Sequence, residues 1–146
     1  LHRRYEKWRP IELSIRADNN RFLTNVGDRD PRAGTLRTTG RAGYLQYGPG
    51  IPLKAGAYRA RWIGTVDAAP GASIGYVEVW NGPDRRLDRQ PIAFSGPDPQ
   101  HRIAHIDFTI PENARSIEYR FWVKPNVPVT LERVELYSAT VIPPEL

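Results

Sequence analysis

Hydrophobic and polar residues alternate without interruption from Ser116 to Lys124. The apolar set is Ile117, Tyr119, Phe121 and Val123, and the other set is Glu118, Arg120, Trp122 and Lys124. A period of two is typical of a β-strand that buries one face and exposes the other. Because Trp122 belongs to the polar set, the pattern predicts an indole ring on the solvent side of a sheet.

The same alternation predicts further strands before and after this stretch. Their expected ranges are 11–16, 34–47, 57–66, 73–81, 89–94, 102–110 and 129–137. We expect the second strand to be interrupted near Gly40 or Gly43, and Trp62 to face the core. In the last strand the apolar positions slip by one residue, which predicts a bulge at Glu132-Arg133.

No stretch shows the periodicity of an amphipathic helix of ordinary length. Short strands separated by Gly/Pro turns therefore predict an all-β fold, a two-sheet antiparallel β-sandwich of about eight strands. The chain has 146 residues, a length that suits one domain with a single core. We expect a linker or N-terminal extension at 1–10, the sandwich domain at 11–140 and a C-terminal tail at 141–146.

Composition narrows the function classes. The net charge is +5, with arginines spread along the whole chain and no recognised nucleic-acid motif, so nucleic acid is not an expected partner. No run approaches the roughly 20 apolar residues of a membrane helix. Cysteine is absent, which excludes disulfides and thiolate metal sites and leaves the cellular location open. The chain does not begin with methionine, and we expect it to be part of a longer protein.

Catalysis is not expected from the sequence. No serine lies in a nucleophile elbow, and Gly48-Pro49-Gly50 lacks the Lys-Ser/Thr pair and the helix of a phosphate-binding loop. His105 and Asp107 should both point outward from one strand, but no third ligand has the spacing of a metal site. We interpret these two residues as a surface pair.

Two segments resemble the jelly-roll carbohydrate-binding modules of bacterial glycan-handling enzymes. One is the segment 43–58, in which Leu-x-Ala-Gly-x-Tyr at 53–58 opens a strand. The other is the segment 116–136, which ends in a strand with the pattern apolar-x-apolar-acid-x-apolar-x-apolar at 129–136. The resemblance spans Gly34 to Tyr137. It implies a jelly-roll sandwich and a non-catalytic, lectin-like accessory module of a larger protein.

The jelly-roll order implies which strands are neighbours. Numbering the eight expected strands along the chain, one sheet should hold strands two, seven, four and five, and the other one, eight, three and six. Strands four and seven would then share an outer face. Its expected ligand-binding residues are Tyr76, Glu78, Trp80, Glu118, Arg120 and Trp122, with Tyr44 and Gln46 at the edge.

Such a face suits a glycan or polysaccharide as ligand. Aromatic rings give apolar contact with a sugar ring, and charged or amide groups bind hydroxyls in fixed directions. The hypothesis requires Trp80 and Trp122 to lie side by side in solvent.

The resemblance also implies a structural calcium ion near the first and last strands, and no other cofactor. The nearest oxygen ligands are Glu12 and Glu132, with Asp18 and Asp30 in the loop that follows the first strand. Glu12 could equally pair with an arginine.

Two other functions remain open. The same exposed face could dock to a partner protein or to another domain of the parent chain, because large exposed apolar patches mark interfaces of every kind. Alternatively, the arginines could bind a polyanion, with affinity that falls steeply with salt.

Overall fold

The computed structural model describes residues 5–142, and the side chains of 14–139 within them. These residues form eleven strands and no helix. The strands are β1 (Tyr5–Arg16), β2 (Gly27–Asp30), β3 (Thr35–Thr38), β4 (Gly43–Gln46), β5 (Pro49–Leu53), β6 (Gly56–Val66), β7 (Ser73–Asn81), β8 (Arg85–Ala93), β9 (Arg102–Ile110), β10 (Ala114–Val123) and β11 (Val129–Ile142).

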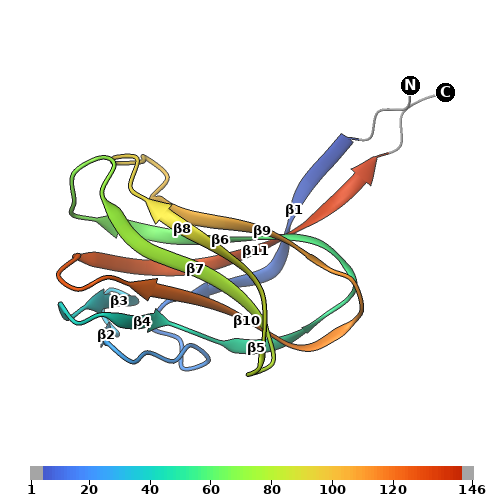
Figure 1. The fold of residues 1–146 in the computed structure, drawn as a ribbon, viewed down its shortest axis with the longest axis horizontal. Helices are drawn as coiled ribbons and strands as arrows, with labels where there is room; N and C mark the ends of the chain where they lie inside the picture. The colour runs from blue at the N-terminus through green and yellow to red at the C-terminus, as the bar shows by residue number, and fades with distance from the viewer. Residues whose placement is uncertain (1–4, 143–146) are drawn as a thin grey trace.

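The strands form two antiparallel sheets that pack face to face, which confirms the predicted sandwich (Figure 1). The six-stranded sheet has the order β2-β3-β11-β6-β9, with β1 also paired to β11. The five-stranded sheet has the order β4-β10-β7-β8, with β5 also paired to β10. The strand neighbours that the family resemblance implies are found in both sheets, as β4-β10-β7-β8 and β1-β11-β6-β9.

The expected second strand is divided between the two sheets. β3 belongs to the six-stranded sheet and β4 to the five-stranded sheet, so the chain crosses between them at 39–42. Gly40 and Gly43 have φ values of 91° and 150°, in the region that favours glycine. The interruption predicted at these glycines is confirmed.

β1 and β11 run beyond the sandwich as a two-stranded ribbon (Figure 1). Tyr5 pairs with Ile142 and Pro10 with Tyr137, so the described part of the expected N-terminal extension is a strand. Two further strands, β2 and β5, lie outside the strand ranges expected from the sequence. Both are short edge strands, and β5 contains two prolines, which an edge position tolerates.

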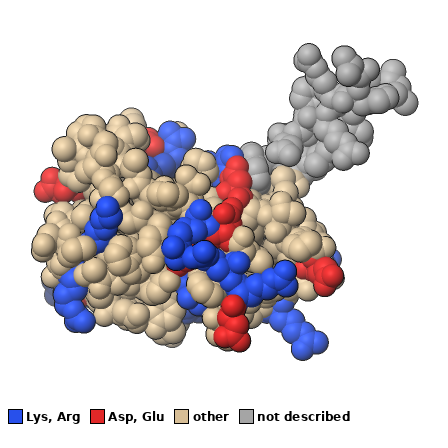
Figure 2. All heavy atoms as spheres, viewed as in Figure 1, with Lys and Arg blue, Asp and Glu red and all other residues tan. Residues whose placement is uncertain are grey.

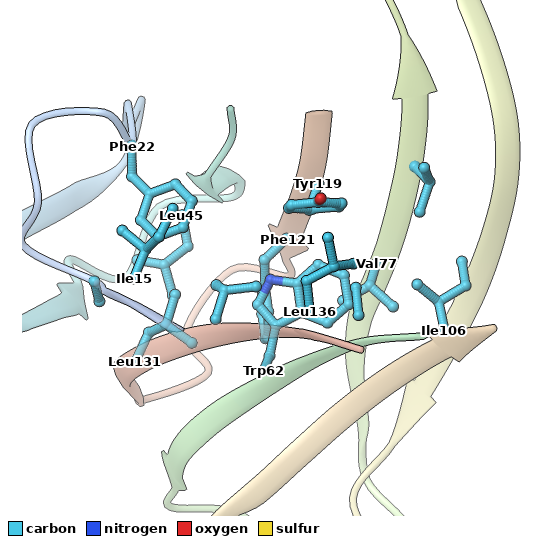
Figure 3. Close-up of a cluster of buried hydrophobic side chains, with 14 of the residues drawn as sticks. Ile15, Phe22, Leu45, Trp62, Val77, Ile106, Tyr119, Phe121, Leu131 and Leu136 are labelled. Carbon is cyan, nitrogen blue, oxygen red and sulfur yellow. The ribbon is translucent and has the colours of Figure 1, made fainter. Parts of the chain in front are cut away.

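The core lies between the sheets and centres on Trp62 of β6, which is fully buried (Figure 3). Its indole points toward Tyr119 and Phe121 of the opposite sheet. The Trp62 Nε1–H donates to Gln46 Oε1 at 2.8 Å, and Gln46 Nε2 donates to the Tyr119 carbonyl oxygen at 2.8 Å. A buried glutamine thus links the two sheets and satisfies the indole N–H, as a buried polar group requires.

Tyr119 gives a test of this core. Its hydroxyl is buried and has no hydrogen-bond partner among the described residues, and burial raises its pKa. A buried unpaired hydroxyl destabilises the folded state, so Tyr119→Phe should leave the free energy of unfolding unchanged or raise it by about 1 kcal/mol.

The matched control is Tyr58→Phe, because the Tyr58 hydroxyl donates to the Lys54 carbonyl oxygen at 2.6 Å. That variant should lose about 1 kcal/mol. Urea denaturation of both variants measures the contrast, and a larger loss from Tyr119→Phe than from Tyr58→Phe would show that the Tyr119 hydroxyl is paired.

Candidate functional site

The residues predicted to share a face are brought together on the outer side of the five-stranded sheet. β10 pairs with β7 in one continuous register, in which Glu118 lies opposite Trp80, Arg120 opposite Glu78, and Trp122 opposite Tyr76. Figure 2 shows this face, where basic and acidic side chains gather side by side over the middle of the sheet. We name it the aromatic face, comprising Tyr44, Tyr76, Glu78, Trp80, Arg86, Arg89, Glu118, Arg120 and Trp122.

Tyr76 and Trp122 form the first stack of this face. Their ring centroids are 5.0 Å apart and their planes differ by 11°. The Arg89 guanidinium carbon lies 4.2 Å from the centroid of the Tyr76 ring, from the neighbouring strand β8. Tyr76 is therefore packed between a guanidinium and an indole.

Gly75 allows β7 and β10 to come this close. A Cβ atom at this position would lie 2.0 Å from the carbonyl oxygen of Trp122, and the residue has a φ of 150°. Only glycine fits such an approach without moving one of the strands.

Arg120 forms the second stack. Its guanidinium carbon lies 4.3 Å from the Trp80 ring centroid and 5.5 Å from that of Tyr44. The same guanidinium contacts the Glu118 carboxylate at 3.6 Å. Cation–π contacts of this kind contribute most when they are partly desolvated, as they are here.

Glu78 lies beneath both stacks, and its side chain is 0% exposed. The Tyr44 hydroxyl donates to Glu78 Oε1 at 2.6 Å, and Arg89 donates from Nε and Nη2 to Oε2 at 3.1 and 2.9 Å. Arg86 adds a contact of 3.5 Å to the same oxygen. The aromatic face is therefore built around one buried carboxylate whose two oxygens are both occupied.

These contacts set the ionisation of the network. Burial opposes the charged form of Glu78, but the hydrogen bonds from Tyr44 and Arg89 outweigh burial and lower its pKa. The Trp80 indole N–H acts on this carboxylate in the same sense, although it makes no hydrogen bond of ordinary geometry. Burial and the bond to Glu78 raise the pKa of Tyr44 to about 12. At neutral pH the centre is thus an anion held by a phenol and guanidinium groups.

The two indoles lie on one face of one sheet, but they are not side by side. Trp80 and Trp122 belong to rows that are four residue positions apart in the β7–β10 register, or about 13 Å along the strands. Both are partly buried. The expectation that they stand next to each other in solvent is therefore wrong, because each indole packs against a different neighbour.

The rings also stand on edge. The 5.0 Å separation of the Tyr76 and Trp122 rings is close to the spacing between strands, and the rings are nearly parallel. Their faces consequently point along the sheet toward neighbouring strands, and their edges point to solvent. Among the described residues, no second ring or guanidinium covers the other face of Trp122.

Gln46 does not lie on this face. Phe121 pairs with Gln46 and Trp122 pairs with Tyr44, so β4 has one extra residue, Leu45, opposite β10. This bulge resets the alternation and turns Gln46 inward, where it is 0% exposed. The predicted role of Gln46 at the edge of the outer face is wrong, and its role is the core hydrogen bonding described above.

Arg86 and Arg89, which supply the cations of the network, were not predicted as site residues. The expected strand started at Arg89, whereas β8 begins at Arg85. The run Arg85–Gln90 is almost wholly polar and shows no alternation, so hydrophobic periodicity gave no signal. The pairing of acidic Glu78 with a nearby basic strand was the available clue.

Those predicted calcium ligands whose side chains are described make other contacts. The Glu12 side chain lies outside the described residues, and Glu132 Oε2 is bound by His101 Nδ1 at 2.7 Å. Asp18 contacts Arg16 at 3.2 Å, and Asp30 accepts two backbone N–H groups of its own turn. Within residues whose side chains are described, no group of three His, Asp or Glu side chains could hold a metal ion.

His105 and Asp107 are both exposed on β9, as expected. Asp107 forms its ion pair with Arg59 of β6, through bonds of 2.6 and 2.9 Å. This pairing lowers the pKa of Asp107. The carboxylate therefore has a structural partner on the adjacent strand.

No protein-family model matches the chain, and neither the curated proteins nor the solved structures include a significant match to it. Between Tyr5 and Ile142 no helix is long and apolar enough to cross a membrane.

Proposed function

We propose that this chain is a non-catalytic, lectin-like carbohydrate-binding module of a larger protein, and that glycan binds on the aromatic face. The observation that supports this proposal most strongly is the mutual locking of the aromatic and charged side chains there. Tyr76 is held between Arg89 and Trp122, and Glu78 is held by Tyr44 and Arg89. Side chains fixed before binding lose little conformational entropy when a ligand arrives.

Trp122 is the proposed apolar contact. The ring face turned away from Tyr76 can receive the C–H face of a sugar, while partly exposed charged groups bind hydroxyls. Arg86 and Arg89 each keep more than a third of the side chain exposed, at 43% and 42%. Their fixed N–H groups donate, and the Glu118 carboxylate accepts. The jelly-roll likeness stays part of this proposal, supported by the order of strands in the two sheets.

A glycan array tests the proposal, followed by titration of any hit. Trp122→Ala should weaken the binding of such a glycan about tenfold, because the stacking of one ligand ring on an aromatic side chain contributes on the order of 1–3 kcal/mol. The matched control is Leu23→Ala, which removes an apolar side chain that is 50% exposed outside the face. Equal weakening by both variants, or an array on which the native protein binds nothing, would contradict the proposal.

A second candidate function is docking to a protein domain, either of the parent chain or of a partner. It is favoured by the edge-on rings and the interleaved guanidinium groups, since tryptophan, tyrosine and arginine dominate the energetics of protein interfaces. Docking predicts that Trp122→Ala leaves glycan binding unchanged but breaks a complex that co-purifies with the full-length parent protein. The two candidates thus differ in which assay responds to one substitution.

A further inference from the structure

A polar groove crosses the outer face of the other sheet. One cavity, of about 540 Å³, lies over β6 and β9 and reaches the edge of β8. A second, of about 460 Å³, lies over β6 and β11. Arg61 and Arg102 line both cavities, so the two adjoin. Each volume is within the range of small-molecule sites.

The charged residues of this groove are almost all paired with one another. Arg102 binds Asp98 at 2.7 Å, His101 binds Glu132 at 2.7 Å and Arg133 binds Glu135 at 3.1 Å. Arg59, which also lines the groove, binds Asp107 at 2.6 Å.

Arg61 differs from these residues. Within the described residues it forms no ion pair, and its guanidinium carbon lies 5.0 Å from the centroid of the Tyr137 ring. Tyr137 is itself anchored, because its hydroxyl donates to Glu135 Oε1 at 2.9 Å. The groove therefore contains a partly exposed guanidinium that is supported on an aromatic ring and forms no ion pair with the described residues.

We propose that this groove binds an acidic oligosaccharide, with Arg61 holding a carboxylate of the sugar chain. A planar guanidinium that rests on a ring keeps its N–H edge free, and this edge matches a carboxylate with two parallel hydrogen bonds. The groove lies on the opposite sheet from the aromatic face, so this proposal stands independently of the function proposed for that face.

The acidic residues in the lining select the kind of anion. Asp98, Glu132 and Glu135 offset the cations with which they pair, so the groove has little net positive charge to attract a ligand with a charge on every unit, such as a nucleic acid or a polyphosphate. The same carboxylates accept hydrogen bonds from hydroxyl groups, and Gln90 and Gln100 add amide donors and acceptors. A hydroxyl-rich chain with spaced carboxylates satisfies both requirements, and the length of two adjoining cavities suits more than one sugar unit.

Calorimetric titration of the intact chain with tetrasaccharides of hyaluronan and of unsulfated chondroitin, in which charged uronate units alternate with neutral units, tests this assignment. At least one should bind, and its counterpart with the carboxyl groups reduced to neutral hydroxymethyl groups should bind about tenfold more weakly, because a hydrogen bond to a charged group is lost. Arg61→Gln should weaken binding of the acidic sugar about tenfold, and Arg61→Lys should recover part of it, since the charge remains without the planar fork.

Arg115→Gln is the matched control, since it removes the same charge from an exposed position on β10, outside the groove. It should change the affinity less than twofold. If Arg115→Gln and Arg61→Gln lower the affinity equally, the effect arises from net charge alone and the proposal is overturned. It is also overturned if neither acidic tetrasaccharide binds, or if inorganic phosphate binds as tightly through Arg61.

Discussion

Trp62→Ala should lower the free energy of unfolding by about 4 kcal/mol, the largest loss we expect from any single substitution described for this fold. Trp62 is fully buried at the centre of the core, where it meets Tyr119 and Phe121 of the opposite sheet (Figure 3). Truncation removes the burial of an indole and leaves a cavity that rigid strands cannot fill. It also leaves Gln46 Oε1 without the N–H that it accepts at 2.8 Å.

Equilibrium denaturation in urea measures this loss, and Trp62→Phe extends the measurement if the alanine variant does not fold. The phenylalanine variant keeps most of the apolar contact but still leaves Gln46 Oε1 without its donor. Its free energy of unfolding should therefore be about 2–3 kcal/mol lower than that of the native protein. Trp122→Ala is the control, because a partly buried indole on the outer face should contribute about 1 kcal/mol. A loss from Trp62→Phe no greater than that from Trp122→Ala would show that the indole–amide bond contributes nothing.

Much of the fold could be predicted from the alternation of hydrophobic and polar residues. Alternation over 57–66, 102–110 and 116–124 identified β6, β9 and β10, and the slip of apolar positions near Glu132 located the bulge that β11 shows opposite Ile63. Both features show which side chains are apolar enough to be buried between the two sheets. β2 and β5 escaped prediction because each is short, lies at an edge and carries residues typical of turns.

The candidate site was only partly predictable. Alternation placed Tyr76, Glu78 and Trp80 on one face of their strand and Glu118, Arg120 and Trp122 on one face of theirs. That the two strands are neighbours was implied by the family resemblance, and the β7–β10 register agrees. Which side chain contacts which was not predictable, because the stacks depend on rotamers and on the close approach at Gly75. Hydrophobic periodicity assumes that residues alternate strictly between the two faces of a strand. It cannot reveal a bulge in a strand as short as β4, and it therefore assigned Gln46 to the wrong face.

Glu78→Gln should lower the free energy of unfolding by about 2 kcal/mol at neutral pH. The buried carboxylate accepts hydrogen bonds from Tyr44 and Arg89 and contacts Arg86, and the amide loses the charge that these contacts need. This loss of stability is smaller than the loss from leaving buried cations without a partner. Arg86 and Arg89 are 43% and 42% exposed, so water can hydrate their guanidinium groups in the variant. Glu118→Gln is the control and should cost less than 0.5 kcal/mol, since its contact with Arg120 is long, at 3.6 Å.

The same variant predicts a pH dependence whose sign follows from the pKa of Glu78. That pKa is lower in the folded state than the ordinary value of 4.5, so the unfolded chain binds the proton first as the pH falls. The stability that Glu78 contributes is therefore complete above pH 4.5 and is lost as the pH falls from there through the folded-state pKa.

The lowered pKa values of Asp98 and Asp107 affect both proteins alike and cancel in the comparison. The difference in unfolding free energy between the native protein and Glu78→Gln should thus stay constant from about pH 7 to about pH 5 and shrink in more acid solution. A difference that widens at acid pH would mean that folding raises the pKa of Glu78, and a difference that persists unchanged would mean that folding does not shift it. In either case the aromatic face would not stabilise the carboxylate as an anion.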